Sequence, residues 1–122
     1  MKPLRKSQDC TDHDPIESWR PKAQETVDYW LALHIGPADG VGTELFYVNV
    51  LSRSAASLLP SDDLLRRKAL IVEEYSWTAV MAAVSEILQQ VEGPDWHSIA
   101  MALSARFYWE FENYQPSGAP NH

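Results

Sequence analysis

Two runs of alternating apolar and polar residues, separated by a glycine-rich loop, constrain the fold of this chain more than any other feature. In the first run four apolar residues share one parity: Tyr29, Leu31, Leu33 and Ile35. The residues between them share the other: Asp28, Trp30, Ala32 and His34. A second run over 43–51 places Phe46, Val48 and Val50 on one side, and the linking residues 36–42 (GPADGVG) are turn formers. Alternation with period two is typical of half-buried strands, so the sequence predicts a β-hairpin over 26–51.

A third strand and two successive helices are predicted next. Residues 68–75 (KALIVEEY) are rich in β-formers, and Ser76 after them is a good helix N-cap. Apolar residues then recur at helical spacing over 76–91: Trp77, Val80, Met81, Val84, Leu88 and Val91. Gly93 and Pro94 separate this helix from a second one over 95–106. Two helices in a row do not make alternating β-α-β units, so we expect an α+β fold, with an antiparallel sheet of about four strands and both helices on one face.

The aromatic stretch 106–115 (RFYWEFENYQ) is predicted to close the sheet as a strand over 107–112. Phe107, Trp109 and Phe111 share one parity and would enter the core, while Tyr108, Glu110 and Glu112 would face water. On such a strand the Cα atoms of Glu110 and Glu112 would lie ~6.7 Å apart, within the range of carboxylate pairs that hydrolyse sugars. Adjacent acids on a wet strand face are more often simply solvated, and we expect no catalytic role.

The length of 122 residues fits one domain. We expect a flexible N-terminal arm over 1–15, with a short edge strand near residues 2–7, a single domain over 16–114 and a disordered tail over 115–122. Trp19 is expected to anchor the N-terminal segment. The basic N-terminus has no apolar stretch behind it, and no run approaches the ~20 apolar residues of a membrane span, so a cytoplasmic protein is predicted.

The charge is negative and unevenly distributed, with a net value of −7. From residue 73 to the end, one arginine stands against seven acids. This balance disfavours nucleic acid and anionic membranes as partners, because both require lysine and arginine, and it favours a basic protein. The alternative is that the charge only maintains solubility.

No metal, cofactor or nucleophile site is predicted. Residues 9–14 (DCTDHD) carry metal-ligand types but lack the glycine and glutamate of a calcium loop and the further cysteines or paired histidines of a zinc site. The loop 36–42 leads into a strand rather than a helix, unlike a phosphate loop. Cys10 is the single cysteine and lies in the expected arm, without a helix N-terminus to activate it.

Several stretches, in order and spacing, resemble the immunity protein 8 family of bacterial polymorphic toxin systems. They are 16–21 (IESWRP), 35–37 (IGP), 42–46 (GTELF), 69–75 (ALIVEEY), 91–93 (VEG), 96–100 (WHSIA) and 109–114 (WEFENY). The chain departs from the family at 52–56, where SRSAA stands in place of a frequent Thr-Pro-x-Trp-Leu run, and at Asn113, which replaces an acid. The first departure would reshape a loop and with it the choice of partner.

The resemblance implies binding rather than catalysis. Such proteins hold the C-terminal domain of a cognate toxin inactive, and many of these toxins are nucleases with a basic substrate groove. We therefore expect an acidic surface to bind the toxin, through Asp62, Asp63, Glu73, Glu74, Glu110 and Glu112. Two alternatives remain, a regulatory domain with another protein partner and a small hydrolase that uses Glu110 or Glu112.

Overall fold

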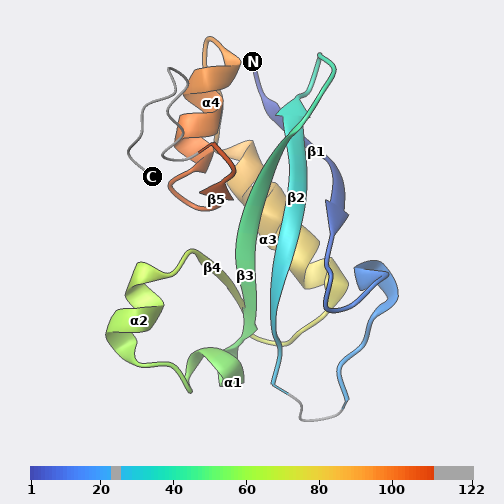
Figure 1. Ribbon diagram of the computed structural model, residues 1–122, viewed down its shortest axis with the longest axis vertical. Helices are drawn as coiled ribbons and strands as arrows, with labels where there is room; N and C mark the ends of the chain where they lie inside the picture. The colour runs from blue at the N-terminus through green and yellow to red at the C-terminus, as the bar shows by residue number, and fades with distance from the viewer. Residues whose placement is uncertain (23–25, 112–122) are drawn as a thin grey trace, which may run out of the picture.

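The protein is built on a five-stranded sheet with β3 near its centre (Figure 1). The computed structural model describes residues 1–22 and 26–111. The strands are β1 (Pro3–Asp9), β2 (Asp28–Pro37), β3 (Glu44–Ser52), β4 (Ala69–Val72) and β5 (Tyr108–Trp109). They run in the order β1-β2-β3-β4. Strand β5 lies on the same side of β3 as β4: β4 pairs with residues 49–52 of β3, and β5 pairs with Phe46 and Tyr47. The predicted α+β class and the hairpin of β2 and β3 are confirmed.

One face of the sheet, called the inner face here, carries the core. The hairpin register pairs Leu31 with Val48 and Leu33 with Phe46, and all four side chains are fully buried. Helices α3 (Trp77–Gln89) and α4 (Trp96–Leu103) cover this face, as predicted for both helices. The alternation read from the sequence therefore identifies the inner face residue by residue.

The two long helices begin where the sequence predicts. The side chains of Ser76 and Asp95 accept hydrogen bonds from the backbone N–H groups of Ala79 and Ser98, which caps both N-termini. Helix α4 ends at Leu103, three residues before the predicted end. The backbone N–H of Phe107 still donates to the Leu103 carbonyl, and the turn places the Phe107 ring in the core.

The connection between β3 and β4 was not fully predicted. These two strands are parallel, whereas the other pairs are antiparallel, and a parallel pair requires a crossover. The crossover contains two short helices, α1 (Arg53–Ala56) and α2 (Ser61–Arg66), and the second has no counterpart among the predicted elements. Both helices pack through a small second cluster against the other face of the sheet, called the outer face here: Leu51, Ala55, Ala56, Leu59, Leu64, Ala69 and Ile71.

The closing strand is present but shorter than predicted. Only Tyr108 and Trp109 pair with β3, because the Glu110 carboxylate accepts the Leu45 N–H at 2.6 Å and the strand gives way to a turn. Phe107 is buried as expected, but the expected burial of Phe111 is wrong, since this ring is 39% exposed and lies edge-on against Trp109. Glu112 lies outside the described residues.

The N-terminal residues contribute the edge strand β1, in agreement with the short strand expected near residues 2–7. A one-turn 3-10 helix, η1 (Ile16–Ser18), follows, and Trp19 then stacks on His13 with ring centroids 3.8 Å apart. Trp19 also contacts Tyr29 and Tyr75 edge-on, so it anchors this segment as predicted. The predicted limits of the domain and the mobility of 1–15 stay predictions, and the tail 115–122 lies outside the described residues.

Candidate functional site

The acidic residues singled out from the sequence do not form one cluster. Asp62 and Asp63 lie in α2, Glu73 and Glu74 directly follow β4, and Glu110 follows β5. Glu110 accepts a hydrogen bond from Leu45 near the start of β3, whereas Val72, the residue before Glu73, pairs with Ser52 at its end. At ~3.3 Å per residue, Leu45 and Ser52 lie roughly 23 Å apart along β3. Glu112 lies outside the described residues. The chain therefore presents these carboxylates in three separate places.

Three of these carboxylates form ion pairs with arginines of their own chain. Asp63 forms an ion pair with Arg67 at 2.7 Å, and Asp62 a longer one with Arg66 at 3.8 Å. Arg53 donates two hydrogen bonds to Glu73, and these bonds together with the positive charge lower the pKa of the Glu73 carboxyl. Such exposed pairs contribute little to stability, but each pair reduces the charge that a partner meets at close range.

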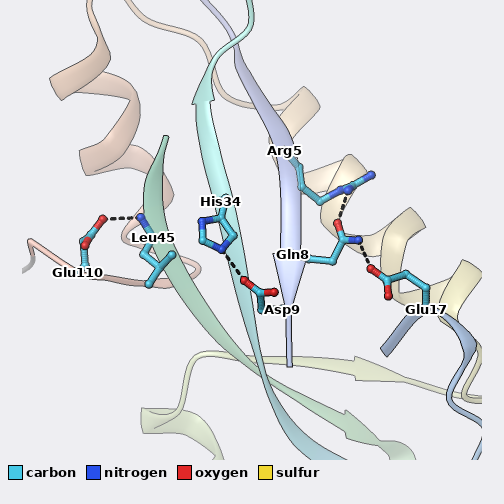
Figure 2. Close-up of polar contacts among 7 residues, drawn as sticks. All are labelled: Arg5, Gln8, Asp9, Glu17, His34, Leu45 and Glu110. Carbon is cyan, nitrogen blue, oxygen red and sulfur yellow. Dashed lines mark hydrogen bonds and ion pairs between the residues drawn. The ribbon is translucent and has the colours of Figure 1, made fainter. Parts of the chain in front are cut away.

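Glu110 has a structural role at the start of β3 (Figure 2). Its carboxylate accepts the Leu45 N–H, while its own backbone N–H donates to the Leu45 carbonyl at 3.0 Å. The neighbouring Trp109 indole donates to Glu44 at 2.9 Å. The carboxylate thus completes the pairing of the β5 end with β3, and this accounts for Glu110 without an acid–base role.

The outer face of the hairpin carries a row of aromatic side chains across three strands. Trp30 on β2 is 45% exposed and Tyr47 on β3 is 37% exposed. Tyr108 on β5 pairs with Tyr47, and its ring contacts the Trp30 ring at a centroid distance of 5.6 Å. Large aromatic side chains held in water on a regular sheet are unusual enough to suggest a binding role.

A buried polar network lies between these aromatics. Asn49 is the register partner of Trp30 and is fully buried, although its parity points it outward. Its amide nitrogen donates to Asp28 at 2.8 Å and to the Tyr29 carbonyl at 3.1 Å, and its amide oxygen accepts from Arg67 at 3.0 Å. Because Arg67 immediately follows α2, this network ties the crossover to the outer face.

A hollow of about 500 Å³ lies between the aromatic row and the crossover, lined by Trp30, Asp63, Arg66, Arg67 and Tyr108. One wall is therefore aromatic and the other is charged. The Lys68 ammonium sits 5.0 Å from the Tyr108 ring centre and donates to the carbonyls of Ser104 and Phe107. These contacts fix the position of Tyr108 beside Trp30.

The β1 side of the sheet carries two smaller polar clusters (Figure 2). His34 Nε2 and the Asp9 carboxylate are 2.7 Å apart on the outer face. Arg5 donates to Gln8, and the Gln8 amide donates to Glu17 at 2.5 Å, which lowers the pKa of the Glu17 carboxyl. Within residues 1–22 and 26–111, no three His, Cys, Asp or Glu side chains gather where a metal ion could be held. The single thiol, Cys10, is buried, and burial raises its pKa.

Comparison with known proteins decides the family. The family described as Immunity protein 8 matches residues 4–114, which span the sheet from β1 to β5 together with all four α-helices. The chain belongs to this family. No curated protein and no solved structure matches the chain. Among the described residues of this immunity protein, no helix is long and apolar enough to cross a membrane.

Family membership implies a toxin protein as the partner, so the exposed surfaces of the chain are the places to look for its binding site. In the sequence of this immunity protein, the alternation places Trp30 on the face opposite Tyr29 and indicates no role for it. The feature that could have indicated a binding role is a tryptophan among the solvent-facing residues of a regularly alternating strand. The contacts of Asn49 with Arg67 left no such signal, because they join residues 18 positions apart through the crossover.

Proposed function

We propose that this immunity protein binds the C-terminal domain of a cognate toxin and keeps it inactive in the cytoplasm of the producing cell. The observation that carries the proposal is the family match, which extends over residues 4–114 and so includes every strand of the sheet. Inhibition by this route requires a matching surface and charge field rather than catalytic groups.

A nuclease is the toxin class that best suits the charge of the chain. Nuclease domains need a basic groove for the phosphate backbone, and the net charge of −7 gives this chain the opposite sign. Complementary charge raises the rate at which two proteins meet. Asp62, Asp63, Glu73, Glu74, Glu110 and Glu112 are proposed to act in this way. Since four of them are held by groups of their own chain, steering at a distance is their proposed role.

Co-expression tests the proposal directly. The toxin domain encoded next to this chain is expressed with and without it, and cell survival and co-purification are scored. We expect survival and a stable complex only when both chains are present. A catalytically inactive toxin domain serves as the control for complex formation without toxicity. Growth arrest in the presence of well-folded chain, with no complex, would refute the proposed function.

The salt dependence of association separates charge steering from contact. The association rate should fall between 50 and 300 mM salt, because exposed charges are screened over ~10 Å at 0.1 M. A combined Glu73→Gln, Glu74→Gln variant should associate more slowly and dissociate at an unchanged rate. An association rate that changes neither with salt nor with these substitutions would refute the proposed role of the acidic residues in steering.

A further inference from the structure

We propose that the outer face of the hairpin is the toxin-binding surface, and that it takes a lysine or arginine of the toxin over the Trp30 indole with its charge at Asp28. The proposal rests on the proposed function and adds to it the surface and the chemistry of the contact. It moves the centre of the interface away from the carboxylates selected from the sequence.

The Trp30 side chain is exposed and at the same time fixed. Asn49, its register partner on β3, is fully buried beside it, so this side of the indole is already occupied. Tyr108 contacts the indole from the side and is itself held by an ammonium 5.0 Å from its ring. A rigid aromatic side chain loses little conformational freedom on binding, which is why tryptophan and tyrosine dominate interface energetics.

The charge around Trp30 favours a cation. Asp28 lies on the same strand face two residues away, at a Cα separation of ~6.7 Å, which one lysine or arginine side chain can span. The Asn49 amide that donates to Asp28 is neutral and leaves the carboxylate charge in place. A cation over an indole face is attracted by the ring, and a carboxylate at its end adds an ion pair.

The arginines beside the hollow do not reverse this charge. Arg67 pairs with Asp63 and Arg66 with Asp62, so these two pairs carry no net charge. Strands β2, β3 and β5 contain no lysine or arginine. Around Trp30, away from the lysine and arginine of the edge strand β1, the outward carboxylates are Asp28 and Glu110. The ammonium beside the aromatic row, that of Lys68, is turned to the carbonyls of Ser104 and Phe107.

A second copy of the chain fits this face poorly. Two outer faces brought together would place like-charged carboxylates against each other, which is unfavourable. A basic protein surface would not repel these carboxylates and would bury the aromatic row. The hollow of about 500 Å³ beside Trp30 gives room for a side chain of the partner next to the indole.

The experiment uses the full chain and the catalytically inactive toxin domain encoded beside it, with affinity measured by calorimetry at 50 and 300 mM salt. Trp30→Ala should weaken binding by about 30-fold or more, as expected for a hot-spot residue. Asp28→Asn should weaken it by about 5- to 20-fold and reduce the salt dependence, whereas Asp28→Glu should keep most of the affinity. Two control variants on the helix layer, Met101→Ala and Glu86→Gln, should bind like the unchanged chain. Met101 is 53% exposed on α4, so its loss removes a comparable exposed apolar group.

The outcomes separate this inference from the proposed function. If the unchanged chain binds the toxin and Trp30→Ala binds equally well, the proposed surface is wrong and the function stands. If the controls on the helix layer lose affinity instead, the interface lies on the opposite side. If the unchanged chain does not bind, both proposals fail. Should Trp30→Ala unfold, Tyr47→Ala on the neighbouring strand replaces it with an expected loss of about 10-fold. A free chain that sediments as a dimer, and as a monomer after Trp30→Ala, would assign this face to self-association and overturn the proposal.

Discussion

The two faces of the β2–β3 hairpin are made by alternate residues of the same two strands, yet they are built in different ways. On the inner face, side chains such as Leu31 and Phe46 are fully buried beneath α3 and α4. On the outer face their immediate neighbours Trp30 and Tyr47 stand in water around a buried asparagine. One face thus supplies apolar burial and the other supplies fixed groups at the surface. The difference teaches that alternate residues of one strand can serve two ends, burial in the core and the display of fixed side chains at the surface.

The largest expected effect tests this division within a single pair of neighbours. Phe46→Ala removes a fully buried ring from the inner face and should lower the free energy of unfolding by about 3–5 kcal/mol. The matched variant Tyr47→Ala, one residue along on the outer face, should cost about 1 kcal/mol or less. Urea denaturation of both variants measures the difference. Equal losses would mean that the outer face is as much a core as the inner one.

A smaller effect is expected at the buried polar residue of the outer face. Asn49→Ala leaves the Asp28 carboxylate and the Arg67 guanidinium without their shared amide and opens a gap beneath Trp30. We expect a loss of about 2 kcal/mol in the free energy of unfolding, since the substitution removes hydrogen bonds to two charged groups, and such bonds contribute about 1.5–3 kcal/mol each where they are shielded from water. The urea midpoint reports this loss. A change below about 0.3 kcal/mol would show that the network does not hold the crossover.

The helix layer of the inner face should respond to loss of an N-cap by about 1 kcal/mol. Ser76→Ala removes the side-chain acceptor of the Ala79 N–H at the start of α3, and caps of this type contribute on that scale. Thr78→Ala, an exposed position in the first turn, is the control and should change the free energy of unfolding by no more than about 0.5 kcal/mol. Thermal unfolding of the two variants makes the comparison.

The smallest effect concerns pH and the cap of α4. The hydrogen bond from the Ser98 backbone N–H lowers the pKa of the Asp95 carboxyl below its ordinary value of 3.8. The ionised form is therefore favoured in the folded state, and its contribution is fully present above the ordinary pKa and is lost as the pH falls through the lower, folded pKa. Asp95→Asn should flatten the acid limb of the stability curve slightly. NMR titration of the Asp95 carboxyl checks the direction, and a raised pKa would contradict it.

The elements that follow local patterns were predictable from the sequence. The alternation from Tyr29 to Ile35 gave β2 and its buried side, and Ser76 and Asp95 marked the starts of α3 and α4. The parallel pairing of β4 was not predictable, because it depends on the crossover through α2 rather than on the composition of residues 68–75. The end of β5 depends on the Glu110 carboxylate bonding to Leu45, a contact between residues 65 positions apart.

The candidate site was less predictable than the fold. Counting charges selected Glu73 and Glu110, but their contacts with Arg53 and Leu45 arise only in three dimensions. The alternation placed Trp30 on the solvent-facing side of its strand, but its contacts with Tyr108 and Asn49 come from other strands. Sequence patterns report which side a residue takes, and they carry no information on which distant residues meet there.

The crossover through α1 and α2 rests on its own small apolar cluster, which shares no residue with the main core, and it reaches the hairpin through Arg67. The residues of this segment before Arg67 can therefore change in length or charge while the main core behind them stays intact. Changes within residues 53–66 would alter one wall of the hollow beside Trp30, so a designer seeking to retarget the protein should begin there.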